Sequence, residues 1–133
     1  MMREWVKKYI GIPFASNGRT ADGCDCYGLA RLVLRNEYGV GLPELSNDYS
    51  SALNVAETAR LFAEHLPVLA GEKLDAPEEG AVVIITEHGV PAHIGVCAGG
   101  GHILHTGVKT GAVCQRETHP GLRGRIAGYY RVR

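Results

Sequence analysis

The sequence predicts a single α+β domain, residues 1–133, in which helices come first and an antiparallel sheet follows. The chain has 133 residues and is 45% hydrophobic, which suits one domain with its own core. In the first half the apolar residues recur with a helical period. After Pro77 they form short runs and alternations separated by glycine-rich turns, as in the strands of a meander.

Three helical segments are expected in the first half. Residues 2–11 carry apolar side chains at helical spacing and end in glycine, as a short amphipathic helix does. A second helix is expected from Asp25, a favourable N-cap residue, to Gly39, a favourable helix-ending residue. A third is expected from Asn54, which resembles a capping box with the glutamate three residues later, and its apolar stripe ends before Pro67.

The second half is expected to form strands. Residues 81–86 are a nearly continuous apolar run, which is typical of a buried strand. Residues 92–98 alternate, with the aliphatic side chains on one face. Further strands are expected at 102–106, 112–116 and 125–132, with glycine-rich turns between them. Consecutive strands joined by short turns pair antiparallel, which completes the α+β prediction.

Charge and hydropathy argue against several classes of partner. The 14 basic and 14 acidic residues cancel, so no net positive field attracts nucleic acid or anionic membranes. The longest aliphatic run, residues 81–85, is far shorter than a membrane span. The charged N-terminal segment lacks the apolar run of a secretory signal, so the chain is expected to be made in the cytoplasm without a signal peptide.

Cys26 is the strongest candidate nucleophile among the four cysteines. It follows the expected N-cap Asp25, where unpaired N–H groups and the helix dipole stabilise a thiolate, and a cationic histidine nearby would lower its pKa further. Cys24 lies ahead of the helix and gains less from the dipole. Cys97 and Cys114 fall within expected strands, where a cysteine is most often a small buried hydrophobe. All four are expected to be thiols, because a core of this size needs no disulfide.

Two histidines are expected to meet on one face of the sheet. If residues 99–101 form a three-residue hairpin loop, Ala98 lies opposite His102 and Gly95 lies opposite His105. His93 is then a diagonal neighbour of His105, with Cα atoms about 7–8 Å apart. A base with a second polar group to orient it is the arrangement that nucleophilic catalysis needs. Glycine at position 95 would leave space on that face for a helix end or a substrate.

Three short motifs resemble those of the NlpC-type cell-wall peptidases, papain-like cysteine peptidases that cut bacterial peptidoglycan stem peptides. The motifs are Asp-Cys-Tyr-Gly-Leu at 25–29, His-Ile-Gly-Val at 93–96 and Ile-Leu-His-Thr at 103–106, with flanking matches at 11–14, 41–43 and 79–82. The resemblance runs from Trp5 to the C-terminus, and the order and spacing of the motifs make it fairly specific. It implies a papain-like fold in which N-terminal helices, including the nucleophile helix, pack on a mostly antiparallel sheet.

Carried over to this chain, the resemblance implies that Cys26 is the nucleophile, His93 the general base and His105 the residue that orients the base. It implies a thiol protease of the cell wall that needs no cofactor and no metal. The bond usually cut by the family joins D-glutamate to a diamino acid, often meso-diaminopimelate. The implied partner is therefore the peptide part of peptidoglycan.

Phe14, Asp25 and Tyr27 are expected in the substrate and oxyanion region. Phe14 stands where the family often has tyrosine, so a hydroxyl that could help at the oxyanion is missing. The Cys26 backbone N–H is an oxyanion donor of the kind that is worth roughly 3–4 kcal/mol in other acyl-transfer sites. Tyr27 replaces the serine of many cellular members and looks more like the phage-tail members, which implies tail proteins as partners and the virion tail as a location.

Three alternatives stay open at this point. Cys24 and Cys26 could bind a metal with His93, His102 or His105, although the spacing fits no common zinc pattern. The chain could instead be a non-catalytic assembly subunit of a phage tail that keeps the fold. The same thiol and base could also serve an acyltransferase or an amidase, since these reactions use the same two groups.

Overall fold

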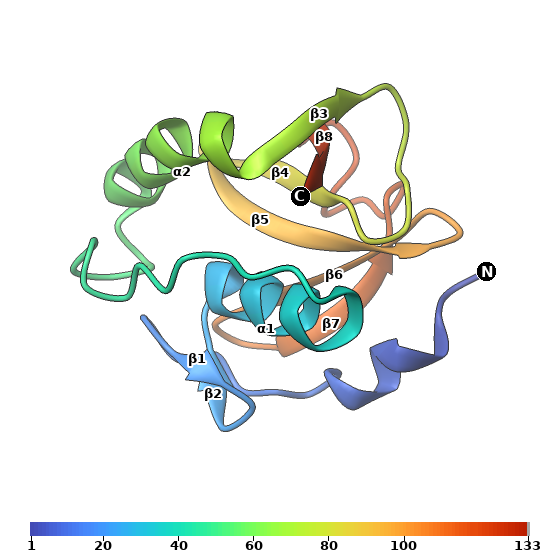
Figure 1. The fold of residues 1–133 in the computed structure, drawn as a ribbon, viewed down its shortest axis with the longest axis horizontal. Helices are drawn as coiled ribbons and strands as arrows, with labels where there is room; N and C mark the ends of the chain where they lie inside the picture. The colour runs from blue at the N-terminus through green and yellow to red at the C-terminus, as the bar shows by residue number, and fades with distance from the viewer. Residues whose placement is uncertain (133) are drawn as a thin grey trace.

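The computed structural model describes the backbone of residues 1–132 and their side chains except those of residues 68–70. The elements, in chain order, are the 3₁₀ helix η1 (Glu4–Lys8), β1 (Arg19–Thr20), β2 (Gly23–Cys24), α1 (Cys26–Tyr38), α2 (Val55–Leu69), β3 (Ala70–Leu74), β4 (Val82–Glu87), β5 (Val90–Gly99), β6 (His102–Gly107), β7 (Gly111–Arg116) and β8 (Ile126–Val132). Figure 1 shows the long strand β5 running past both α1 and α2, and each helix contacts it.

The main sheet has six strands in the order β3-β8-β4-β5-β6-β7. Every neighbouring pair in it is antiparallel, so the predicted α+β fold with a mostly antiparallel sheet is confirmed. Strands β4 to β7 form the expected meander, and β8 returns to lie beside β4 (Figure 1). Strand β3 at the edge was not predicted, because its alanine, glycine, glutamate and lysine have low strand propensity.

Both faces of the sheet are covered. One face packs against the helices through a core that includes Leu29, Val33 and Val96. The other face carries a smaller cluster that includes Ile85 and Leu122, the latter from the loop before β8. Burial on two sides explains why β4 is apolar at successive positions rather than at alternate ones.

The N-terminal helix differs from its prediction. It is a 3₁₀ helix of five residues rather than an amphipathic α-helix, and its N-cap residue Arg3 makes no side-chain cap. The Arg3 N–H instead donates to the Ala98 carbonyl at 2.8 Å, and the Gly11 N–H donates to the Ala112 carbonyl at 2.9 Å. Because the sheet holds both ends of this short segment, its conformation follows the strands rather than its own periodicity.

The second α-helix, α2, forms only one of the two hydrogen bonds of the predicted capping box. Asn54 Oδ1 accepts from the Glu57 N–H at 3.1 Å, but the Glu57 carboxylate binds the N–H and hydroxyl of Ser50 instead of completing a capping box. The helix also continues past Pro67 to Leu69, whereas the sequence predicts an end before the proline. Proline near a helix end removes only one of the last hydrogen bonds.

The turn between β5 and β6 contains a bulge. Val96 pairs with Leu104 and Cys97 with Ile103, the register that the histidine prediction needs. Gly99 rather than Ala98 then lies opposite His102, so the predicted three-residue loop is wrong in its last pair. The three glycines at 99–101 all have positive φ, which L side chains rarely adopt and which allows the tight bulged turn.

The start of α1 is fixed by the buried carboxylate of Asp25. Its oxygens accept from the Gly28 N–H at 2.8 Å and the Asn17 N–H at 2.9 Å. They also accept from Arg19 Nη1 at 3.1 Å and from the Tyr49 hydroxyl. Asp25 is therefore the predicted N-cap, and at 1% exposure it also ties α1 to the loops before and after the helix.

Gly28, in the first turn of α1, allows the preceding loop to approach. A Cβ at this position would lie 2.0 Å from the Gly18 carbonyl oxygen and 3.0 Å from the Cys24 Cβ. No side chain fits there, so glycine is required for the loop to reach the Asp25 carboxylate. The helix ends at Gly39, whose φ of 67° gives the left-handed cap that the sequence predicts.

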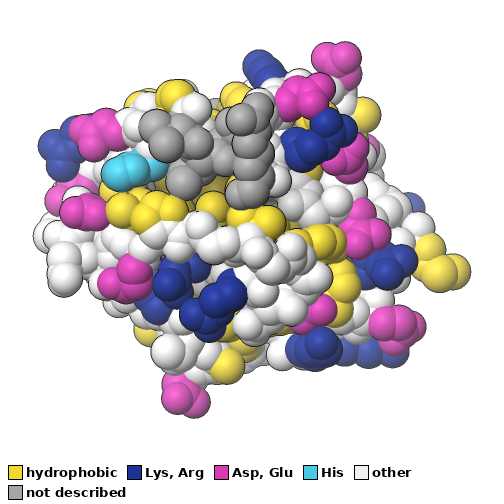
Figure 2. Space-filling model, in the orientation of Figure 1, with side chains coloured by type: hydrophobic (Ala, Val, Ile, Leu, Met, Phe, Trp, Pro, Cys, Tyr) yellow, Lys and Arg dark blue, Asp and Glu magenta, His cyan; other side chains and the backbone are white. Residues whose placement is uncertain are grey.

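The surface carries no single-sign field on the face seen in Figure 2, where acidic and basic side chains are interspersed. Several are paired, such as Arg131 with Glu72 and Glu78. Among the described residues, no helix has the length and apolar character needed to cross a membrane.

We predict that Asp25→Ala lowers the free energy of unfolding by about 3–5 kcal/mol, because the buried Arg19 guanidinium and the Tyr49 hydroxyl lose their acceptor. Urea unfolding measures the change. Asp25→Asn, which keeps a capping oxygen but not the charge, should have a free energy of unfolding between those of the wild type and Asp25→Ala. The exposed Asp22→Ala is the matched control and should change stability by less than about 0.5 kcal/mol. Equal stability of the two alanine variants would contradict this role for Asp25.

Candidate active site

A cleft of about 310 Å³ brings together residues from distant parts of the chain. Cys26 of α1, His93 of β5 and Thr106 of β6 line it. Phe14 and the residues around Leu53, before α2, complete its walls. Both α-helices, the strands β4, β5 and β6 and the loops between elements therefore contribute to one solvent-facing hollow, as expected for a ligand site.

Cys26 is the first residue of α1 and is 8% exposed. Backbone hydrogen bonds from Ile94 and Tyr27 favour its thiolate, but burial and the negative charge of Asp25 outweigh them and raise the pKa of the Cys26 thiol to about 12. The sequence predicts that the helix start lowers the pKa of Cys26, but in the structure its pKa is raised. The same carboxylate that caps the helix disfavours a second negative charge beside it.

His93 and His105 lie side by side, as predicted from the strand register. Their rings are edge to face with centroids 5.3 Å apart, and His93 Nε2 lies 3.1 Å from His105 Nδ1. Gly95 is needed for this approach, because a Cβ there would lie 2.9 Å from the Leu104 carbonyl oxygen and 3.2 Å from the His105 Cβ. The space above Gly95 is thus filled by β6, not by a helix end or a substrate.

The pair of histidines continues to a third side chain. His105 Nε2 lies 2.8 Å from Gln115 Oε1 on β7, so a chain of three side chains runs from the cleft across β6 to β7. Gln115 was not predicted as a site residue. It pairs with Ile103, which puts it diagonal to His105 on the same face, and the alternation of β6 and β7 could have identified it.

Both imidazoles are neutral at neutral pH. Desolvation, with the nearby charges of His105 and Arg125, lowers the pKa of His93 to about 3. Burial also lowers the pKa of His105, although its hydrogen bond with Gln115 opposes the shift. Together with the raised pKa of Cys26, this gives a neutral thiol and a neutral imidazole rather than a preformed ion pair. The thiol proton must therefore move to the base during attack.

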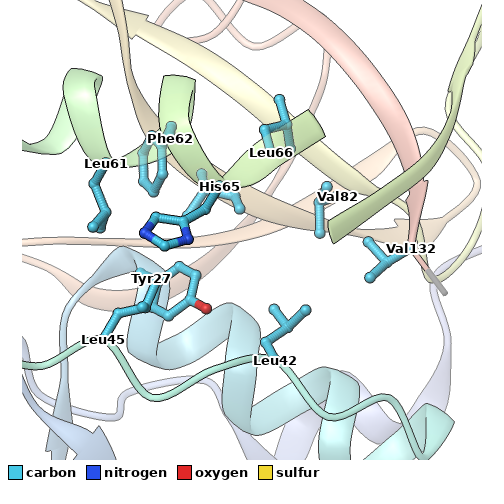
Figure 3. A pocket seen from close by; sticks show the side chains of 10 residues that line it. Tyr27, Leu42, Leu45, Leu61, Phe62, His65, Leu66, Val82 and Val132 are labelled. Atoms are coloured by element: carbon cyan, nitrogen blue, oxygen red, sulfur yellow. The ribbon is translucent and has the colours of Figure 1, made fainter. Parts of the chain in front are cut away.

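Of the three residues predicted in the substrate and oxyanion region, only Phe14 lines the cleft. Phe14 lines the cleft as expected, and it has no hydroxyl to offer. Asp25 is enclosed by its hydrogen-bond partners and does not line the cleft. Tyr27 points away into an apolar pocket between α1 and α2 (Figure 3), where its ring packs near Phe62 and its hydroxyl donates to the Pro43 carbonyl at 2.6 Å. Asp25 thus fixes the helix start at Cys26, whereas Tyr27 ties α1 to the segment at Pro43.

The candidate metal ligands do not converge. Cys24 is buried in β2, and His102 Nδ1 lies 3.2 Å from the Gly99 carbonyl at the far end of β6. Within residues 1–132, no three His, Cys, Asp or Glu side chains are close enough to hold a metal ion. All four cysteines are free thiols.

Sequence comparison agrees with this geometry. The model of the NlpC/P60 family matches residues 11–130, a range that includes Cys26, His93, His105 and Gln115. The chain belongs to the NlpC/P60 family. No curated protein sequence matches it at a significant level.

Solved structures with the NlpC/P60 fold superpose on nearly the whole chain. An NlpC/P60 family protein from Bacillus cereus matches with a TM-score of 0.68 and 18% identity over 96% of this chain, but this chain spans only 37% of that protein. The NlpC/p60 domain of the peptidoglycan hydrolase SagA gives 0.61 and 19%, covering 94% of this chain and 91% of that domain. The peptidoglycan hydrolase RipB of Mycobacterium tuberculosis gives 0.60 and 16%, covering 96% and 60%. At these identities the matches establish the fold.

We predict that neutral, buried His93 makes the protein acid-sensitive. Its folded pKa lies below the ordinary 6.5, so the unfolded chain binds this proton first as the pH falls. The stability that depends on neutral His93 is complete above pH 6.5 and is lost between pH 6.5 and about 3. Between about pH 7.5 and pH 5 the loss should be about 2 kcal/mol.

Urea unfolding at the two pH values measures this loss. The His93→Asn variant should lose clearly less stability than the wild type over the same interval. His88→Asn is the matched control, because His88 is exposed in the β4–β5 turn, where asparagine also tolerates its φ of 51°. His88→Asn should lose as much stability as the wild type over this pH interval. If His93→Asn also loses as much as the wild type, buried His93 is not the source of the acid sensitivity.

Proposed function

We propose that this NlpC/P60 domain is a cysteine endopeptidase that hydrolyses the stem peptides of peptidoglycan. The observation that carries the proposal is that Cys26, at the start of α1, and His93, hydrogen-bonded to His105, line one cleft. SagA and RipB, whose folds match, are named peptidoglycan hydrolases. A nucleophile, a base and an orienting residue are the groups that peptide hydrolysis through a covalent intermediate needs.

In the proposed reaction, Cys26 Sγ attacks the peptide carbonyl carbon while His93 takes the thiol proton. The carbonyl oxygen becomes an oxyanion, which N–H groups at the start of α1 stabilise, since the first N–H groups of a helix have no intrahelical partner. The C–N bond then breaks, and His93 returns the proton to the leaving amine. Water attacks the resulting thioester with His93 as base, which releases the acid and restores the Cys26 thiol.

We further propose that the bond cut joins D-glutamate to a diamino acid. Glu87 is the acidic side chain among the described residues that line the cleft. Arg125 Nη2 donates to Glu87 Oε1 at 2.8 Å, which fixes the carboxylate at the edge of the cleft near the two histidines. Such a carboxylate is a suitable partner for the free amino group of a diamino acid.

An acyltransferase or amidase would use the same groups and differs only in the acceptor or in the bond. The alternative of a non-catalytic subunit is less well supported, because the cleft keeps the thiol and the base. An association with phage tails and a cytoplasmic site of synthesis stay predictions from the sequence.

We predict that the purified protein digests peptidoglycan, and that mass spectrometry identifies new D-glutamyl and diamino-acid ends. Cys26→Ala should abolish cleavage, while Cys114→Ala, which removes a thiol outside the cleft, should not. His93→Asn should lower the rate by about 10²–10⁴-fold because asparagine cannot transfer a proton. His105→Asn should lower it less, because an amide oxygen can still accept a hydrogen bond from His93. Release of transfer products instead of free acids would favour the acyltransferase.

A further inference from the structure

We propose that Gln115 is a positioning residue that sets the tautomer of both histidines, so that His93 presents an unprotonated Nδ1 as the base for Cys26. The inference rests on the proposed function for its catalytic meaning, but the tautomers themselves can be observed without any reaction. The contact that carries the proposal joins Gln115 Oε1 to His105 Nε2 at 2.8 Å.

The direction of the hydrogen-bond chain follows from its last acceptor. An amide oxygen accepts hydrogen bonds and cannot donate one, so His105 Nε2 must carry the proton and donate to Gln115. In a neutral imidazole the other nitrogen is then bare, so His105 Nδ1 accepts from His93 Nε2 at 3.1 Å. This places the His93 proton on Nε2 and leaves Nδ1 as its only basic nitrogen.

The opposite direction would disable the base. If the Gln115 amide N–H donated to His105 Nε2, the proton of His105 would lie on Nδ1 and point at His93 Nε2. His93 would then carry its own proton on Nδ1 and could not accept one from Cys26 there. Because burial keeps both imidazoles neutral, one proton on each ring is the relevant state, and its position decides whether His93 is a base.

Long-range ¹H–¹⁵N NMR spectra of the imidazoles near neutral pH test the proposal directly, since protonated and bare ring nitrogens have well-separated ¹⁵N shifts. The wild type should show bare Nδ1 and protonated Nε2 in both His93 and His105. In Gln115→Met, which keeps the length but removes the acceptor, His105 should show a mixture of tautomers. A protonated Nδ1 in wild-type His93, or unchanged tautomers in Gln115→Met, would overturn the proposal.

Kinetics give a second readout that a purely structural role would not move. Gln115→Met should lower kcat by about 10–100-fold with little change in KM, the range seen when residues that orient metal-binding imidazoles are replaced. Gln115→Glu keeps an acceptor and should retain more activity, but its charge should raise the pKa of the histidines and shift the acid limb of kcat/KM to higher pH. The predicted tautomers without any peptidoglycan cleavage would count against the proposed function and leave the positioning role intact.

A separate observation concerns Thr106, whose hydroxyl we infer hydrogen-bonds to the bound peptide. Thr106 lines the cleft and is 2% exposed, and its Oγ1 is a buried side-chain oxygen without a hydrogen-bond partner among the described residues. Thr58, the other buried threonine of the cleft, differs, since its Oγ1 lies within 3.2 Å of the Asn54 and Val55 carbonyls. A buried hydroxyl without a partner destabilises the free protein, and a peptide N–H or carbonyl in the cleft would satisfy it.

Thr106→Val tests this inference because stability and activity should move apart. Removing a hydroxyl that has no partner should leave the free energy of unfolding unchanged or higher. The same substitution should lower kcat/KM for the peptide by about 2–10-fold, the value of one hydrogen bond. Thr106→Ser, which keeps the hydroxyl, should retain kcat/KM.

Two results would overturn the inference for Thr106. A clear loss of stability in Thr106→Val would mean that the hydroxyl already has a partner in the free protein. Unchanged kcat/KM in a stable Thr106→Val variant would mean that the peptide does not use it. The stability measurement needs no substrate, so it stays informative if peptidoglycan proves not to be cleaved.

Discussion

The buried Asp25 carboxylate is the interaction on which the site depends. By accepting from Gly28 it decides where α1 begins, and therefore where Cys26 stands. By accepting from Arg19 and Tyr49 it also fastens the loops on both sides of α1 to the helix start. One side chain thus links a local capping rule to the long-range order of the site. A buried carboxylate is tolerable only because each oxygen is hydrogen-bonded and a cation lies beside it.

This arrangement has a chemical cost at the nucleophile. Burial and the adjacent carboxylate raise the pKa of Cys26 to about 12, while desolvation lowers the pKa of His93 to about 3. In the free protein the Cys26 thiol therefore keeps its proton and the His93 imidazole is neutral. Reactivity then depends on the orientation of the base. The contacts of His93 with His105 and of His105 with Gln115 fix that orientation.

The sequence predicts those features that depend on local rules. Asp25 and Gly39 mark the ends of α1, and alternation with a glycine turn brings His93 to His105. Features that depend on packing could not be read in this way. The sign of the Cys26 pKa shift reflects burial by segments far away in the chain, and the missing partner of Thr106 is a property of the folded cleft. Gln115 lies between these cases, since it needs the register of a second hairpin.

Trapping the covalent intermediate would establish whether Cys26 is the nucleophile. The protein is mixed with a stem peptide, quenched in acid during turnover, digested and mapped by mass spectrometry. We expect a D-glutamyl-terminated acyl group as a thioester on Cys26, and none on Cys24, Cys97 or Cys114. Steady cleavage of the peptide with no acyl group on Cys26 at any time, and unaltered cleavage by Cys26→Ala, would contradict it.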